Sequence, residues 1–254
     1  MLPLTVVIVA KNEAHQIAAC IKPWLGVTDD ILVADNGSTD GMADVARAAG
    51  ARVIQVVWQG YSATKNEANR QARYNWILSL DADEVANPEL LAAVQQLFQT
   101  EPKSSQAFAL RRRLVYLGKT LRHGAVASEY RLRLFHRSVG SWNGQDVHED
   151  IQFSLPVTVT RLNGFLWHYS CTDEADHLAR LEKYAQLFAH QQKALGRKAI
   201  WLKAWLSPCF GFVKNYVFKG GFLDGQAGYR FARNEMRYTQ RKYALLQELN
   251  QASL

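Results

Sequence analysis

The first hundred residues alternate short apolar runs with amphipathic segments, and this alternation restricts the fold more than any other feature. Expected strands are Leu4 to Ala10, Ile31 to Ala34, Arg52 to Trp58 and Trp76 to Leu80. Expected helices are Glu13 to Trp24, Met42 to Ala49 with Gly50 as its stop, Thr64 to Arg73 and Pro88 to Phe98. Strands and helices that alternate at this spacing form βαβ units. The sequence therefore predicts an α/β fold with a Rossmann-like, mostly parallel sheet and helices on both faces.

The remainder of the chain does not alternate strands with helices in this way. Strand-like segments are Phe108 to Tyr116, Arg131 to Phe135, Trp142 to Asp150 and Val157 to Trp167. The helical period then returns from Asp173 to Leu195, and Gly196 is placed to end that helix. We expect a main domain over residues 1–170, divided into halves at 1–100 and 101–170, and a helical extension over 171–254.

Composition restricts the class of protein further. A hydrophobic content of 48% with mixed charges is typical of a globular chain, and the net charge of +7 favours anionic partners such as nucleic acid, phosphorylated sugars or lipid headgroups. The three cysteines, Cys20, Cys171 and Cys209, form neither a disulfide framework nor a zinc pattern. This cysteine pattern favours a reducing cytoplasm. The first apolar run ends at Lys11, which fits neither a signal peptide nor a spanning helix.

An acidic cluster, Asp81-Ala82-Asp83-Glu84, directly follows the expected strand from Trp76 to Leu80. Open α/β sheets bind ligands at the carboxyl ends of their strands. Two carboxylates one residue apart repel each other unless a cation joins them, and such a cation would also hold a diphosphate. The cluster predicts a divalent metal and a nucleotide. A polar turn before a helix capped by Asn87 explains part of the same pattern.

Four motifs in order carry a family resemblance: Lys11-Asn12-Glu13, Asp35-Asn36-Gly37-Ser38-Thr39-Asp40-Gly41, Lys65-Asn66, and Asp81-Ala82-Asp83-Glu84. Together they resemble a family 2 glycosyltransferase with the GT-A nucleotide-sugar fold. The resemblance implies that residues 1–170 form the catalytic domain, with the nucleotide-sugar in the first half and the acceptor in the second.

The resemblance also implies roles for individual residues. Contacts to the nucleotide-sugar would come from Ala10, Glu13, Asp35, Lys65, Asp81, Asp83, Arg131 and Arg133. Asp83 would bind Mg²⁺ or Mn²⁺. His168 ends a strand and would lie on the same side, so it is the second residue expected at the metal or the diphosphate. Asp35 also fits a turn that bonds the Ser38 and Thr39 amides, and Asp40 fits a helix cap. Arg131 and Arg133 follow a period of two, which predicts one shared face.

The general base is expected in the acidic cluster from Asp146 to Asp150. Inverting members of the family place a carboxylate near the acceptor, and we rank Glu149 first, Asp150 second and Asp146 third. The alternative is a polar turn after Trp142.

Later motifs resemble a narrower group, the lipopolysaccharide-core glucosyltransferases that add β-1,4-linked glucose to a heptose. They include Gly221-Phe222-Leu223-Asp224-Gly225 and the Arg131 to Phe135 run. The resemblance implies UDP-glucose as donor and an inverting mechanism. Transfer of another UDP-sugar, such as N-acetylglucosamine or galactose, to a different acceptor stays open.

Aromatic and basic residues alternate in the last sixty residues, which suits the surface of an anionic membrane. They are Trp201, Trp205, Phe210, Phe212, Tyr216 and Phe218, with Lys198, Lys203, Lys214 and Lys219. We expect a protein peripheral on the inner face of the cytoplasmic membrane. The same pattern fits an amphipathic helix packed on the main domain.

Two other classes of protein compete with this interpretation. A sugar nucleotidyltransferase usually has a glycine-rich loop where this chain has Lys11-Asn12-Glu13. A nucleic-acid-binding module would use the Arg111-Arg112-Arg113 run but would leave the ordered acidic motifs unexplained, so no nucleic-acid partner is expected.

Overall fold

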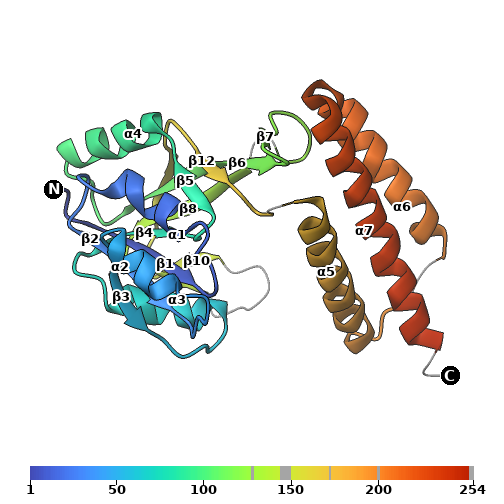
Figure 1. Ribbon diagram of the computed structural model, residues 1–254, viewed down its shortest axis with the longest axis horizontal. Coiled ribbons are helices and arrows are strands. Elements are labelled where there is room, and N and C mark those ends of the chain that lie inside the picture. Colours follow the sequence, from blue (N-terminus) through green and yellow to red (C-terminus); the bar gives the residue numbers. More distant parts are fainter. Residues whose placement is uncertain (127–128, 144–149, 172, 199–200, 252–254) are drawn as a thin grey trace. The chain divides into compact units, whose positions relative to one another are not determined.

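The computed structural model describes residues 1–126, 129–143, 150–171, 173–198 and 201–251 (Figure 1). The chain divides into two compact units, which we describe separately. The first contains Met1–Arg112 and Glu129–His168, and the second contains residues 113–128 and 169–254.

The first unit is built on a sheet whose first four strands are parallel. They are β1 (Leu4–Ala10), β2 (Asp30–Asp35), β3 (Arg52–Gln55) and β4 (Trp76–Leu80), in the spatial order β3-β2-β1-β4. Ala10 pairs with Asp35, and Ile8 pairs with Leu80. The carboxyl ends of β1, β2 and β4 therefore meet at one edge, and the predicted parallel sheet is confirmed.

The other strands make the rest of the sheet mixed. β8 (Glu129–His136) is antiparallel to β4 and to β6 (Gln106–Tyr116), and β11 (Thr158–Arg161) is parallel to β6. β5 (Glu84–Ala86) is antiparallel to β12 (Leu166–His168). A separate hairpin joins β9 (Gly140–Trp142) to β10 (Ile151–Phe153). The expected strand from Val157 to Trp167 is thus two strands, and the segment from 144 to 149 lies outside the described residues.

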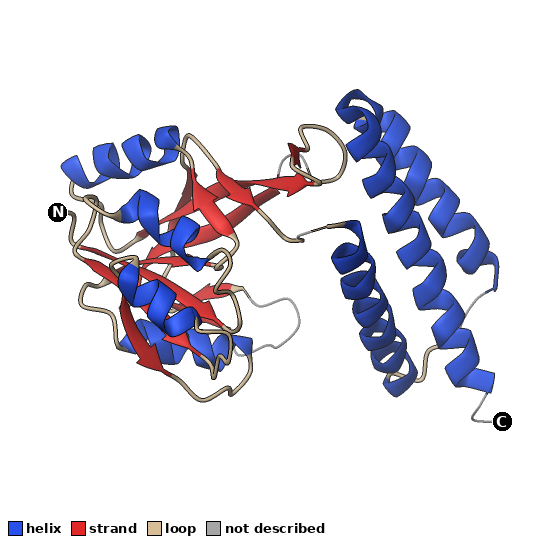
Figure 2. Ribbon diagram, viewed as in Figure 1, coloured by secondary structure: helices blue, strands red, loops and turns tan. Residues whose placement is uncertain are grey.

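Helices cover both faces of the sheet, as predicted (Figure 2). One face packs on α1 (Ile17–Ile21), the 3-10 turn η1 (Lys22–Trp24), α2 (Met42–Ala48) and α4 (Pro88–Gln99). The opposite face packs on α3 (Tyr61–Arg70) and on the β9–β10 hairpin. Because apolar side chains cover both faces, β1, β2 and β4 are buried almost throughout. The α/β prediction is therefore confirmed.

Some predicted boundaries were wrong by a few residues. The first helix begins at Ile17 and not at Glu13, β3 ends at Gln55 and not at Trp58, and α3 begins at Tyr61. Local signals that recur at helix ends were more reliable: the Asn87 side chain accepts a hydrogen bond from the Leu90 amide, and Pro88 is the first residue of α4.

A register shift in β8 changes the expected direction of its side chains. Leu132 pairs with Ala109, but Leu134 pairs with the adjacent residue, Phe108. One residue of β8, Arg133, is therefore extra, as in a β-bulge. Leu132 and Leu134 consequently pack in the cores on opposite faces of the sheet. The expectation that Arg131 and Arg133 share a face rested on uninterrupted alternation, which the extra residue interrupts, and it stays a prediction.

The second unit is mainly helical (Figure 2). Its elements are the end of β6, β7 (Lys119–Thr120), α5 (Glu174–Ala194), α6 (Trp201–Val213), the π-helix η2 (Lys214–Phe218), the 3-10 helix η3 (Gly221–Asp224) and α7 (Gly225–Gln251). Its core contains Tyr116 and Phe231, and the buried Tyr116 hydroxyl contacts Asn234 and His177. Within the described part of the chain, no helix is both long enough and apolar enough to cross a bilayer.

Candidate functional site

The loops after β1 and β2 are joined by hydrogen bonds at the carboxyl edge of the sheet. The Asn12 amide donates to the Ser38 hydroxyl (2.9 Å), and the Asn12 side-chain oxygen accepts from the Thr39 amide (2.8 Å). Asn12 adopts a positive φ of 58°, which asparagine tolerates better than most residues. The Lys11-Asn12-Glu13 motif and the motif that begins at Asp35 are therefore joined by hydrogen bonds.

Asp35 lies at the end of β2 and is 2% exposed. Its carboxylate accepts from the Ser38 amide (2.9 Å) and from the Gln55 side chain (2.8 Å). Burial raises the pKa of Asp35, but the hydrogen bonds from Ser38 and Gln55 outweigh burial and lower it. The turn alternative is correct for the Ser38 amide, whereas Thr39 bonds Asn12 instead. Asp35 is a fixed, ionised acceptor at the sheet edge.

Asp40, Glu13 and Ala10 make contacts within the protein at the same edge. Asp40 accepts from the amide of Met42, the first residue of α2, and from that of Ala14, as expected for a cap. The Glu13 carboxylate accepts from the Gln16 side chain (2.6 Å). The Ala10 carbonyl accepts from the Asn36 amide (3.1 Å), which joins the ends of β1 and β2.

The structure brings together the two residues predicted to bind metal. The Nε2 atom of His168 lies 3.1 Å from Oδ2 of Asp83. The β5–β12 pairing produces this contact, because His168 is opposite Glu84 in the register. The Oδ1 atom of Asp83 is buried and has no hydrogen-bond partner among the described residues. A buried carboxylate oxygen without a donor fits a cation ligand.

Asp81 lies between two cations. Its carboxylate is 3.4 Å from Nζ of Lys65 and 2.5 Å from Nη2 of Arg133. Burial raises the pKa of Asp81, but the charges of Arg133 and Lys65 outweigh burial and hold it well below the ordinary value. Both cations were predicted to contact the nucleotide-sugar. In the structure, both Lys65 and Arg133 form ion pairs with the Asp81 carboxylate.

A buried ionic network beneath the site was missed by sequence reasoning. Nη2 of Arg133 also lies 2.6 Å from Oε1 of Glu84, whose side chain is fully buried. The other oxygen of Glu84 accepts from the Asp81 amide (3.1 Å), and Arg112 approaches at 3.6 Å. Arg112 also bonds Glu129 at 2.6 Å, so this residue of the basic run neutralises carboxylates within the sheet. Glu84 therefore fixes the acidic loop through its hydrogen bond with the Asp81 amide.

Arg131 has a different environment from Arg133. Its side chain is half exposed, and its guanidinium bonds Glu129 at 2.5 Å. The phosphate contact expected of Arg131 stays a prediction.

Lys65 and Asn66 of α3 hold the end of the β9 strand. The ammonium of Lys65 lies 4.4 Å from the centre of the Trp142 ring, a cation–π contact, and Lys65 is only 5% exposed. The Asn66 side chain donates to the Trp142 carbonyl (3.0 Å) and accepts from its amide (2.9 Å). The alternative of a solvated surface lysine is therefore wrong, and the motif fixes the residue that begins the loop toward the predicted base.

Asn66→Asp should reduce the free energy of unfolding by about 1–3 kcal/mol, because a carboxylate cannot donate to the Trp142 carbonyl. Urea unfolding followed by circular dichroism measures the change. Glu67→Gln on the same helix is the control. The Glu67 side chain is 41% exposed and pairs with the exposed Arg70, so the value should change by no more than about 0.5 kcal/mol. Equal effects of the two substitutions would contradict a specific link between Asn66 and Trp142.

Of the three candidates for the base, the described residues include Asp150 alone. Its carbonyl accepts from the Asn143 amide (3.0 Å), and its carboxylate accepts from the Ile151 amide (2.8 Å). Asp146 and Glu149 lie outside the described residues, so their roles stay predictions.

The chain is similar in sequence to proteins named as glycosyltransferases. The chain is 29% identical over 241 residues to the lipopolysaccharide core biosynthesis glycosyltransferase LpsC of Rhizobium meliloti, covering 90% of this chain and 86% of LpsC. It is 26% identical over 237 residues to an uncharacterized glycosyltransferase of Rickettsia prowazekii, covering 90% and 81%.

Solved structures show weaker similarity. TarS from S. aureus matches with a TM-score of 0.47 and 12% identity, covering 99% of this chain and 92% of TarS. Glucosyl-3-phosphoglycerate synthase from Mycobacterium tuberculosis, in complex with Mn²⁺ and UDP-glucose, matches with a TM-score of 0.38 and 23% identity over 44% of each chain.

The family comparison covers the first four strands, from Thr5 onward, and the acidic loop. The model of the family described as Glycosyl transferase family 2 matches residues 5–154, more than half of the chain. The chain therefore belongs to glycosyl transferase family 2 and is a glycosyltransferase.

Proposed function

We propose that the protein is an inverting, metal-dependent enzyme that transfers glucose from UDP-glucose to a heptose of the lipopolysaccharide inner core. The observation that carries the donor half is the contact between Asp83 and His168 at the carboxyl end of the parallel strands. This pair, with the unpartnered Oδ1 of Asp83, offers an oxygen and a nitrogen ligand where a diphosphate would bind.

Asp83 and His168 fit Mg²⁺ or Mn²⁺ as the protein's share of a coordination shell. Among the described residues, no group of three or more His, Cys, Asp or Glu side chains is placed to hold a metal ion. Diphosphate oxygens and water would supply the other ligands. When bound, the cation would neutralise charge on the departing nucleoside diphosphate.

The protein's own groups would hold the nucleoside. Asp35 is ionised and fixed, so its remaining lone pairs suit donors on uracil or ribose. Lys65 is held between Asp81 and Trp142, close to the same edge, where its charge would face the diphosphate.

The acceptor half needs one proton transfer. A carboxylate takes the proton of the acceptor hydroxyl, the oxygen attacks the anomeric carbon, and the bond from that carbon to the phosphate oxygen breaks with UDP as leaving group. We propose Glu149 as this base, with Asp150 second and Asp146 third. Attack opposite the leaving group inverts the anomeric centre.

The acceptor assignment rests on the similarity to LpsC and on the surface of the second unit. Large side chains exposed there include Trp205 (67%), Phe210 (64%) and Phe218 (76%). Lys203, Lys214 and Lys219 are exposed on the same segments. Aromatic and cationic side chains in one region suit an anionic bilayer surface. We propose peripheral attachment to the inner face of the cytoplasmic membrane. The alternative is another UDP-sugar, such as N-acetylglucosamine or galactose, and a different acceptor.

Calorimetric titration with UDP and with UDP-glucose tests the donor site directly. We expect binding in Mn²⁺, loss of binding in EDTA, and affinity lower by about 10–100-fold in His168→Gln. His190→Gln is the control, because His190 is exposed on α5 in the second unit and is not among the residues proposed for the donor site. Absence of binding under every condition would exclude a UDP-sugar donor, and tight binding in EDTA would exclude the metal.

A further inference from the structure

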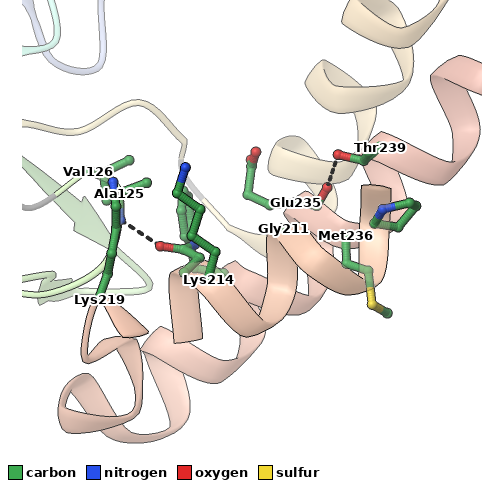
Figure 3. Close-up of a pocket in the computed structure, with 11 residues that line it drawn as sticks. Ala125, Val126, Gly211, Lys214, Lys219, Glu235, Met236 and Thr239 are labelled. Atoms are coloured by element: carbon green, nitrogen blue, oxygen red, sulfur yellow. Dashed lines mark hydrogen bonds between the residues drawn. The ribbon is translucent and has the colours of Figure 1, made fainter. Parts of the chain in front are cut away.

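A cavity of about 340 Å³ lies within the second unit, and its lining includes none of the residues proposed for the transfer reaction. This volume is in the range of small-molecule sites, which is about 300–1,000 Å³. Its walls come from α6, η2, α7 and the loop before residue 127 (Figure 3). The lining residues are Ala125, Val126, Pro208, Gly211, Lys214, Asn215, Lys219, Phe231, Glu235, Met236 and Thr239.

Two irregularities in the helices border this cavity. Pro208 lies inside α6 and has no amide hydrogen, so the turn before it lacks one helical hydrogen bond. The π-helix η2 follows directly after α6, and π-helices are rare and frequently occur at functional sites. Asn215 of η2 accepts from the Ala125 amide (2.5 Å), which fixes the loop at one end of the cavity.

The cavity has an apolar part and a cationic end. Val126, Phe231 and Met236 supply apolar surface. Lys214 and Lys219 lie at the end near Ala125 and Val126, whereas Met236 and Thr239 lie at the opposite end (Figure 3). Both lysines are exposed, and neither forms an ion pair with another described residue. An elongated molecule with an apolar body and one anionic end would complement this lining.

Glu235 is the carboxylate in the lining. Its Oε1 atom lies 3.8 Å from Nε2 of His177. Burial raises the pKa of Glu235, although the charge of Lys242 opposes burial. A carboxyl group that keeps its proton more readily is better tolerated beside a hydrocarbon chain.

We propose that this cavity binds the hydrocarbon chain of an anionic membrane lipid, with Lys214 and Lys219 contacting its phosphate. The choice of a membrane lipid rests on the proposed function, whereas the cavity and its charges do not. Phe210 and Phe218 are exposed on the same α6–η2 segment, so the cavity adjoins apolar surface suited to a bilayer. Such a site would hold one lipid molecule, in addition to the general attraction of the charged surface.

Gly211 allows the cavity to be filled without disturbing the fold. It lines the cavity, and a Cβ atom built there meets no heavy atom within 4 Å. A larger side chain should also favour the helix, because glycine is a poor helix former. Gly211→Ala and Gly211→Trp therefore form a series of increasing obstruction, and thermal unfolding checks that each variant folds.

The test is calorimetric titration of the full chain with dodecyl phosphate below its micelle concentration, without UDP or metal. We expect saturable binding of one molecule per chain, little change in Gly211→Ala, and affinity at least tenfold lower in Gly211→Trp. Lys214→Gln with Lys219→Gln should weaken dodecyl phosphate about tenfold. Lys198→Gln with Lys203→Gln is the matched control and should bind like the wild type, since neither lysine lines the cavity.

Several outcomes would overturn the proposal. One is the absence of saturable binding, and another is unchanged affinity in folded Gly211→Trp. Equal affinity for inorganic phosphate would show an anion site without a lipid. Because no donor nucleotide is present, failure here leaves the donor assignment intact, and failure of UDP to bind leaves the lipid result intact.

Discussion

Asp83→Ala should lower kcat/KM by about 10³-fold or more while leaving the protein folded. A bound divalent ion contributes several kcal/mol of charge stabilisation, and each 1.36 kcal/mol corresponds to a factor of ten in rate. Asp83 provides the buried oxygen that has no other partner among the described residues, so its removal should abolish the metal contribution. Steady-state kinetics and metal-dependent UDP calorimetry together measure the loss.

Asp44→Ala is the control for this prediction. Asp44 is also an aspartate of the first unit, but its side chain is 88% exposed and pairs only with Arg47 among the contacts described. We expect unchanged kinetics and unchanged Mn²⁺ dependence. If Asp83→Ala kept metal-dependent UDP binding within a few-fold of the wild type, Asp83 would not be the principal ligand.

Arg133→Met should reduce the free energy of unfolding by about 3–5 kcal/mol, because it removes the shared partner of two carboxylates. Glu84 is fully buried and would then depend on Arg112, which lies 3.6 Å away. Asp81 would retain Lys65 at 3.4 Å. Urea denaturation measures the loss. Because Arg133 holds the pKa of Asp81 below its ordinary value, the share of the stabilisation that comes from Asp81 should be present at neutral pH and decrease as the pH falls.

The matched control lies two residues away on the same strand. Arg131→Met replaces a half-exposed guanidinium whose recorded partner is Glu129, and a change of no more than about 0.5 kcal/mol is expected. Similar losses for Arg131→Met and Arg133→Met would mean that the network around Glu84 does not stabilise the fold.

Much of the fold could be predicted because its signals are local. Apolar runs of four to seven residues marked β1, β2 and β4, and the polar residues that follow them marked the edge where ligands bind. The cap at Asn87 and the stop at Gly50 depend only on neighbouring residues. The Asp83–His168 contact was also predictable, since both residues follow or end short strands.

The ionic network and the strand irregularity could not be predicted, because they depend on pairing between distant segments. No residue near Glu84 in the sequence indicates that Arg133 forms an ion pair with it. Arg133 is buried and Arg131 is half exposed, a difference that their period-two spacing does not indicate. Trp142 gave no sign of its role, because its partners Lys65 and Asn66 lie on another element.

The pairing of β5 with β12 sets an order of events during synthesis. Asp83 emerges from the ribosome early and directly precedes β5, but His168 ends β12 and is the last residue of the first unit; both strands have only three residues. A nascent chain that ends before His168 lacks half of this pair, so strong metal binding has to wait until β12 joins the sheet. Ligands that bind only the completed site also stabilise it. Metal affinity in a series of truncated chains would therefore report when the first unit closes.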